Sequence, residues 1–401
     1  MKEDLIARNR ISFARICLLG SALCTFCAFV VDLPAQDFKT VHNGVEYAQV
    51  QHKVGNDSVK VNLLRLDLTK VRLDVHHAMD AAVGTEKTSS IATRHGAVAA
   101  INAGFFRLDT SIWAGEDVGT LMIDYRLLSE PSSNRSNLLL ANLPKQTITA
   151  FARPNGGLVI NATSPICGVD RERKDTDIVV YTSEFGPTTR TRPGGTEIVL
   201  KGCRGMCSST EVFEGAGDTQ IPAGGYVISI GPTPNEEQVK FINSMKASKG
   251  WADVRSLLTN IDTALPFEDK NYAPEDAVAG VPQLIKNGKI DITWEQEKGS
   301  KSFVETRHPR TAVAKLKDGK FLMVTVDGRQ PGVSAGMNLY ELADYLLSIG
   351  AVDAMNLDGG GSTTMFLDGK VVNTPSDKEG ERKVGDAILV TLRKVQEPPR
   401  K

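Results

Sequence analysis

The strongest constraint on the fold is a β-hairpin followed by a helix and another strand in the last third of the chain. Two apolar stretches, TAVAKL and FLMVTV, flank Asp318-Gly319, a dipeptide that strongly favours a hairpin turn. If these two residues alone form the loop, Arg310 faces Asp327 at the open end of the hairpin. The sequence therefore predicts a guanidinium beside a carboxylate at that end.

A helix is predicted over residues 339–348, where leucines and Ala343 recur at helical spacing. Asn338 fits the N-cap position, Glu341 fits its capping-box partner and Gly350 fits the C-terminal stop. A strand, a helix and a second strand form a crossover unit, so strands 320–326 and 351–357 are expected to be parallel.

Polar residues follow both of these strands. Asp327 and Arg329 end the first strand, and Asp358 and three glycines end the second. Ligands of α/β sheets bind outside the carboxyl ends of strands. Two carboxylates and two arginines, Arg310 and Arg329, are therefore expected in one crevice.

The triglycine Gly359–Gly361 is expected to bring the backbone close to another group, because ordering glycine is entropically costly. Successive N–H groups in such a turn can bind an anion, with Ser362 and Thr363 as further donors. The alternative is a tight turn with surface ion pairs. Beside an anion, Asp358 could ligate a metal, be protonated, or face the carbon under attack, as in glycoside chemistry at a sugar phosphate.

The remaining pattern predicts a strand-rich α+β protein, with mixed sheets and a few packed helices. Short strands recur at regular spacing, and two further helices are expected over residues 236–245 and 251–258. With a net charge of −1 and interspersed charges, the chain lacks the basic footprint of a nucleic-acid-binding protein. We expect residues 36–90 to add strands to a main domain spanning residues 91–396.

Residues 1–35 have the parts of a secretory signal peptide: basic residues, an apolar run over 16–31 and a small residue at Ala35. The run is shorter than the ~20 residues of a membrane-spanning helix, so cleavage is favoured over a membrane anchor. Export would permit a disulfide between Cys203 and Cys207, with Cys167 left over. Their spacing alone does not decide whether this disulfide forms.

Four motifs resemble the phosphodiester glycosidase family, and the resemblance covers roughly residues 90–395. The motifs are INAGFF at 101–106, AVAGVPQLIKNGKI at 277–290, RHPRTAVA at 307–314 and the stretch from VDGRQPG to GGGSTTM at 326–365. The resemblance implies a strand-rich glycosidase-like domain and hydrolysis of a sugar-1-phosphodiester, with N-acetylglucosamine as the sugar. Related bacterial proteins are associated with exopolysaccharide.

Carried over by position, the resemblance implies a site that combines carboxylates, arginines and a Gly-rich loop. The catalytic residues would be Asp358, as base or nucleophile, and Asp327; the substrate- or phosphate-binding residues would be Arg310, Arg329, Asn102, Gly104, Asn356, Gly359, Gly360, Gly361, Ser362 and Thr363. The first motif departs from the family pattern, because Ala103 stands where a glycine is common. That methyl group either narrows the pocket or indicates an ordinary φ angle.

Two other functions remain open. A metal-assisted phosphodiesterase would cut the P–O bond, with Asp327 and Asp358 as metal ligands, whereas an envelope module would bind anionic glycan without turnover. No cofactor is required by the sequence, although a divalent metal fits these carboxylates. We expect a sugar phosphodiester or anionic glycan as partner, no nucleic acid, no stable membrane span after signal cleavage, and a secreted or cell-envelope location.

Overall fold

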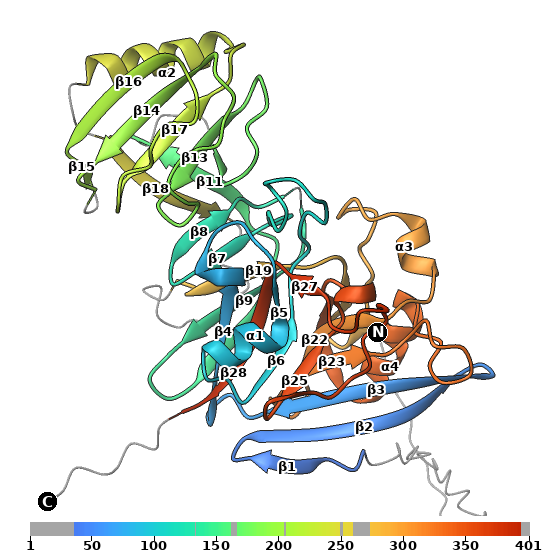
Figure 1. Ribbon diagram of the computed structural model, residues 1–401. Coiled ribbons are helices and arrows are strands. Elements are labelled where there is room, and N and C mark those ends of the chain that lie inside the picture. The colour runs from blue at the N-terminus through green and yellow to red at the C-terminus, as the bar shows by residue number, and fades with distance from the viewer. Residues whose placement is uncertain are drawn as a thin grey trace, which may run out of the picture. The chain divides into compact units, whose positions relative to one another are not determined.

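The computed structural model describes residues 36–132, 134–161, 167–203, 206–248, 252–259 and 273–393, with only the backbone for 255–259 (Figure 1). The predicted signal peptide lies outside the described residues. The described part belongs to one compact unit that starts at Gln36. The expected strand-rich composition with few helices is confirmed. No helix among the described residues has the length and apolar character to cross a membrane.

The largest sheet has eight strands and contains the predicted hairpin. In spatial order its strands are β1 (Lys39–His42), β2 (Val45–Val54), β3 (Asp57–Leu66), β23 (Phe321–Val326), β22 (Arg310–Leu316), β24 (Ala351–Asn356), β20 (Gln283–Lys286) and β21 (Lys289–Ile290). The long strands β2 and β3 extend this sheet from the N-terminal segment (Figure 1).

A five-stranded sheet carries the other chain segments that reach the site. Its order is β26 (Lys370–Val371), β25 (Met365–Leu367), β6 (Ala99–Asn102), β28 (Asp386–Leu392) and β4 (Val71–His77). The short strands β27 (Lys383–Val384) and β5 (Glu86–Lys87) form a separate pair.

Three further sheets come from the middle of the chain. One contains β10 (Thr147–Ala152), β9 (Asn137–Asn142), β19 (Asp276–Ala279), β7 (Leu121–Ile123) and β8 (Arg126–Ser129). The second contains β12 (Gly168–Val169), β13 (Ile178–Thr182), β17 (Tyr226–Ile230), β14 (Gly195–Lys201) and β16 (Ser209–Ala216). The third contains β11 (Asn155–Ile160), β18 (Ala252–Thr259) and β15 (Met206–Cys207).

The helices are short and cover sheet faces. They are α1 (Thr88–Arg94), α2 (Glu236–Ala247), α3 (Lys301–Glu305), α4 (Leu339–Ser348) and the 3₁₀ turns η1 (Ala78–Asp80) and η2 (Gly360–Ser362). The predicted helix at 339–348 is confirmed, with the Asn338–Glu341 capping box and Gly350 at φ 92°.

The predicted helix at 251–258 is wrong, because this segment is strand β18 and pairs antiparallel with β11 and β15. Backbone pairing on both sides satisfies its N–H and C=O groups and overrides local helical preference. Next to it, Cys203 and Cys207 form a disulfide, while Cys167 is buried and is not part of a disulfide.

The central strands β22 and β23 of the eight-stranded sheet are buried on both faces, which explains why they are continuously apolar. Ala312, Ala314 and Val324 point toward the leucines of α4. Val313 and Met323 point the other way and pack with residues of β4, β6 and β28. The alternation fixes the strand register, because a one-residue slip would exchange the two faces.

Candidate active site

The predicted crossover brings two strand ends to one edge of the eight-stranded sheet. Strands β23 and β24 each pair antiparallel with β22, so they run in the same direction with β22 between them. Asp327 and Asp358 follow their carboxyl ends, and Arg310 begins β22 at the same edge. The parallel direction is therefore confirmed, although the two strands are not hydrogen-bonded neighbours.

The predicted pairing of Arg310 with Asp327 is wrong by one residue. Arg310 pairs with Val326, because the loop has three residues and Gly319 adopts φ 83° at its last position. Leu316 N–H donates to Lys320 O at 2.9 Å and closes this loop. A type I turn followed by a left-handed glycine is a common three-residue hairpin loop. The shift places Asp327 beyond the paired positions.

The triglycine is needed because three different groups approach its backbone. A side chain at Gly359 would meet Pro309 O at 2.8 Å. Gly360 adopts φ 63° and lies under the guanidinium of Arg329, where a Cβ would meet Nη2 at 3.1 Å. Gly361 lies against the ion pair of Asp377 and Arg382, which leaves no room for a Cβ.

The predicted backbone anion nest is mostly occupied by the protein itself. The N–H of Gly360 donates to Pro309 O at 2.9 Å, and Ser362 N–H donates to Gly359 O at 3.2 Å. The Gly359 N–H faces the Asp358 carboxylate and lowers its pKa. Positive charge for an anion must therefore come chiefly from side chains.

Arg310, Arg329 and His308 form a cationic cluster beside the triglycine. Arg329 Nη2 lies 3.3 Å from His308 Nδ1. Burial and both guanidinium groups lower the pKa of His308, and burial followed by Arg329 lowers the pKa of Arg310 to about 10. Neither arginine forms an ion pair with a carboxylate of the described residues. This pair of unneutralised cations is suited to an anionic ligand.

Arg310 is 1% exposed and is held by backbone carbonyls. Its Nε donates to Met337 O at 2.9 Å, and Nη2 donates to Phe303 O at 2.7 Å and Thr306 O at 2.8 Å. The guanidinium also lies 4.9 Å from the centre of the Phe303 ring. Its orientation is thus fixed before any ligand binds, and Nη1 makes no hydrogen bond within the described residues.

Beyond Phe303 lies an apolar pocket of about 260 Å³. Phe105 and Phe303 meet edge to face in it, with ring centres 6.0 Å apart. The remaining lining residues are Arg135, Val281, Gly299 and Ser300. Because Phe105 directly follows Gly104 and Phe303 covers Arg310, this pocket adjoins the predicted site.

Asp358 is half-buried, and burial raises its pKa to about 6. Ser362, Arg382 and the Gly359 N–H oppose the shift. The Ser362 hydroxyl lies near the carboxylate without hydrogen-bonding geometry to it. A carboxyl group with a pKa close to neutrality is suited to general acid or base chemistry.

A second carboxyl group beside Asp358 is Asp386, which the sequence interpretation missed. It begins β28, is buried, and accepts a hydrogen bond from Gly104 N–H at 2.5 Å. Burial and the charge of Asp358 raise its pKa. Behind it, burial and Asp386 raise the pKa of Asp117. The only sequence signal was an aspartate at the start of a buried apolar strand.

The two predicted asparagines have different surroundings. Asn102 donates to Asp358 O at 2.7 Å and accepts from Thr311 Oγ1 and Thr364 N–H. It therefore positions the backbone of Asp358. Asn356 donates to Val281 O and Leu357 O, while its Oδ1 has no partner among the described residues.

The hydroxyls of Ser362 and Thr363 are also buried and have no hydrogen-bond partner among the described residues. A buried hydroxyl without a partner costs about 1–3 kcal/mol. Such atoms in native proteins call for an explanation, and a bound ligand is one.

Asp327 lies apart from this carboxyl pair. It is 0% exposed, accepts hydrogen bonds from Thr374 N–H at 3.1 Å and has Lys60 Nζ at 3.7 Å. Burial raises its pKa, and the hydrogen bond from Thr374 N–H and the charge of Lys60 oppose the shift. These contacts connect β23 to the segment after β26.

The described residues contain one group of three side chains with metal-ligand spacing: His76, Asp80 and His95. It includes neither Asp327 nor Asp358, the two carboxylates for which the sequence left metal ligation open.

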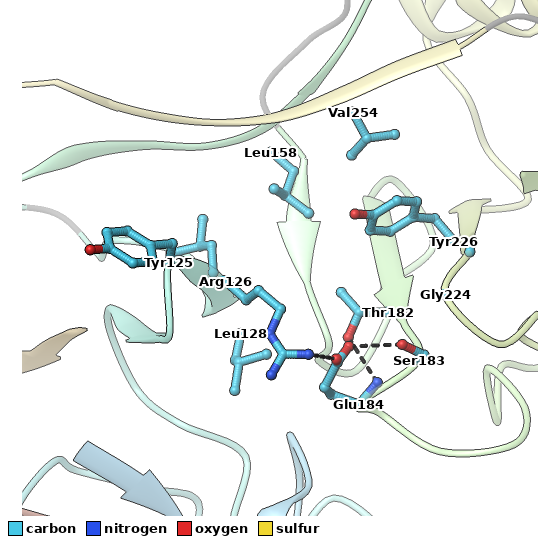
Figure 2. Close-up of a pocket in the computed structure, with 12 residues that line it drawn as sticks. Tyr125, Arg126, Leu128, Leu158, Thr182, Ser183, Glu184, Gly224, Tyr226 and Val254 are labelled. Carbon is cyan, nitrogen blue, oxygen red and sulfur yellow. Dashed lines mark hydrogen bonds and ion pairs between the residues drawn. The ribbon is translucent and has the colours of Figure 1, made fainter. Parts of the chain in front are cut away.

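A pocket of about 330 Å³ lies between β8, β13, β17 and β18, apart from the predicted residues (Figure 2). Figure 2 shows Arg126 directed at Glu184, with Tyr125 and Tyr226 on either side. None of the predicted site residues lines it.

Sequence comparison adds a family to this geometry. Residues 209–391 match the model of the phosphodiester glycosidase family. This segment is therefore similar to phosphodiester glycosidases. The resemblance inferred from the motifs is thereby confirmed, and the match contains every predicted site residue except Asn102 and Gly104.

The chain is also similar to a protein of known name and to proteins of known structure. An N-acetylglucosamine-1-phosphodiester alpha-N-acetylglucosaminidase from Bos taurus is 38% identical over 126 residues, which are 29% of this chain and 22% of the relative. The chain thus spans about a fifth of that curated relative.

Two solved structures share the fold. One, a hypothetical protein from Synechocystis, has a TM-score of 0.70 and 23% identity over 90% of this chain and 64% of its own. The other, a putative exported protein from Burkholderia pseudomallei K96243, has a TM-score of 0.65 and 24% identity over 83% of this chain and 74% of its own.

The structure also explains Ala103, the departure from the family pattern. Ala103 is 0% exposed within the hydrophobic core and is not among the residues with positive φ. Its carbonyl accepts from Asp358 N–H at 2.9 Å. The methyl group therefore points into the core and does not narrow the site.

Proposed function

We propose that this protein is a hydrolase that cleaves the glycosidic C–O bond of a sugar-1-phosphodiester, with N-acetylglucosamine as the sugar. The observation that carries the proposal is the unneutralised arginine pair beside Asp358, a carboxyl group with a pKa of about 6, inside a segment similar to phosphodiester glycosidases. The name of the Bos taurus relative supports the substrate class.

The phosphate binds at the cationic cluster in this proposal. Arg329 lies over Gly360 and presents its guanidinium, while Arg310 is oriented by its three carbonyl contacts. The departing phosphate gains negative charge as the C–O bond breaks. Fixed cations stabilise that charge more in the transition state than in the bound substrate, which is the requirement for catalysis.

Asp358 acts at the anomeric carbon, as the base that activates water or as the nucleophile. Its pKa of about 6 leaves it mostly ionised at pH 7 while it still retains basicity. We assign the second carboxyl of the site to Asp386, whose pKa is raised by burial and by Asp358. Asp327, the second carboxylate expected from the sequence, would position the segment at Thr374.

The sugar lies between the carboxyl pair and the Phe105–Phe303 pocket. Aromatic rings pack against the apolar face of a sugar, while the free oxygens of Asn356, Ser362 and Thr363 suit its hydroxyl groups. We also propose that the protein is exported and acts in the cell envelope or outside it. The N-terminal signal pattern and the exported Burkholderia protein of the same fold support this location.

The test is release of N-acetylglucosamine from its α-1-phosphate methyl diester by residues 36–401. Asp358→Asn should lower kcat at least about a hundredfold, the usual range for loss of an acid or base group. Asp344→Asn removes an exposed carboxylate of α4 and serves as the matched control. A folded wild-type protein that releases no sugar from a panel of sugar-1-phosphodiesters would refute the proposal.

A further inference from the structure

A large basic cleft lies immediately beyond the first motif of the site. It encloses about 890 Å³, and its lining residues are Arg107, Ser111, Ile112, Trp113, Glu172, Arg173, Lys174, Asp175, Thr176, Arg190, Thr191 and Arg192. Five cationic side chains face two carboxylates there. One of the two, Glu172, is already paired with Arg107 at 2.6 Å.

The remaining cations of the cleft have no carboxylate partner among the described residues. Arg173 donates to Ser229 Oγ, Ile230 O and Arg192 O, and Arg190 lies over the Phe185 ring and donates to Ile112 O. Lys174 and Arg192 are exposed, and their side chains form no ion pair with a described residue. Unneutralised positive charge gathered in a concave surface attracts anions.

The cleft also has the groups that sugars need. Thr176 supplies an exposed hydroxyl, and Ile112 supplies an exposed apolar side chain. Its volume is near the upper end of the ~300–1,000 Å³ typical of small-molecule sites. It is therefore large enough for more than one sugar unit.

The cleft and the candidate active site share one short chain segment. Gly104 contacts Asp386 in the site, and Arg107 lines the cleft three residues later. Three extended residues span at most about 10 Å. The backbone of Arg107 is fixed on the opposite segment by its N–H bond to Glu116 O at 2.7 Å.

We propose that this basic cleft binds an anionic glycan whose repeating units are linked by phosphodiesters, and that it holds the polymer while one unit occupies the active site. The identity of the polymer rests on the proposed function. The cleft therefore selects a chain of several sugar phosphates over a single diester, because a monomer reaches only the catalytic cluster.

The test compares binding and turnover of two substrates. Binding of a fluorescein-labelled oligomer of six N-acetylglucosamine-1-phosphate repeats is measured at low and high salt for the wild type and for Lys174→Gln/Arg192→Gln. The control Lys240→Gln/Lys289→Gln removes two exposed cations from α2 and β21. Turnover of the α-1-phosphate methyl diester is measured in parallel for each variant.

We expect the cleft variant to bind the oligomer at least tenfold more weakly and with a smaller salt dependence, while kcat/KM for the methyl diester stays unchanged. The control should bind the oligomer as the wild type does. Unchanged oligomer binding by the cleft variant, or an equal loss in the control, would overturn the proposal. Equally tight binding of a single-stranded DNA hexamer would overturn it too, because the cleft would then not select glycan.

The result separates this proposal from the proposed function. In one outcome, the wild type releases no sugar, and the Lys174→Gln/Arg192→Gln variant binds the oligomer more weakly than the wild type does. The cleft then remains a glycan-binding site, and the proposed hydrolase function is refuted. If sugar is released from the methyl diester and the oligomer does not bind, the hydrolase remains and the cleft proposal fails.

Discussion

The pKa of Asp358 makes a quantitative prediction about the pH dependence of hydrolysis. Burial raises this pKa from 3.8 to about 6, a shift of roughly two units, or about 3 kcal/mol between the two protonation states. At that pKa the carboxyl is about 90% ionised at pH 7 and about 10% at pH 5. If the ionised form is required, kcat/KM should fall about tenfold between pH 7 and pH 5.

A substitution at Arg382 should shift the acid limb of the pH profile, which is the fall of kcat/KM below neutral pH. Arg382 lowers the pKa of Asp358, so Arg382→Gln should move the limb above pH 6. Arg126→Gln is the matched control, because it breaks an exposed ion pair with Glu184 outside the site. The measurement is kcat/KM for the methyl diester from pH 4.5 to 8.5. An acid limb with its midpoint near pH 4 in the wild type would refute the reasoning. A midpoint at lower pH in Arg382→Gln than in the wild type would refute it too.

Three further predictions concern single residues of the site. Arg329→Ala should lower kcat/KM about 10- to 100-fold, which corresponds to the loss of a hydrogen bond to a charged group. Arg329→Lys should retain only part of the wild-type activity, because an ammonium group cannot bind phosphate through two parallel N–H groups as a guanidinium does. Steady-state kinetics and inhibition by phosphate measure both effects. Asp358→Asn should be more stable than the wild type at pH 8 by up to about 3 kcal/mol. The raised pKa of Asp358 stabilises the folded state at low pH, and this contribution is lost as the pH rises from about 4 to 6. Urea unfolding curves of the two proteins that coincide at pH 8 would contradict this prediction. Ala103→Gly should destabilise the protein by about 1 kcal/mol without widening substrate range, since the methyl group lies in the core; faster turnover of bulkier sugars would contradict this.

Local sequence signals predicted the framework of the site well. The α4 helix, its capping box and the parallel direction of β23 and β24 follow from spacing and turn chemistry that act within a few residues. The close contacts of the triglycine also follow from residue type, although the sequence did not reveal that Pro309, Arg329 and the Asp377–Arg382 pair make them.

Long-range pairing explains what the sequence did not predict. The one-residue shift in the hairpin depends on which loop type Lys317–Gly319 adopts, and the sequence permits both. Asp386 reaches Asp358 only because β28 pairs with β6, and these strands are far apart in sequence. The same applies to β18, whose helical pattern is overridden by pairing with β11.

The most direct test of the central claim is to locate the bond that breaks. Hydrolysis of the N-acetylglucosamine α-1-phosphate methyl diester in ¹⁸O-labelled water, followed by mass spectrometry, reports which product takes up the oxygen of water. The C–O cleavage proposed here predicts one labelled oxygen in N-acetylglucosamine, unlabelled methyl phosphate and no reaction by Asp358→Asn. Labelled oxygen in the phosphate product would instead show P–O cleavage and contradict the account.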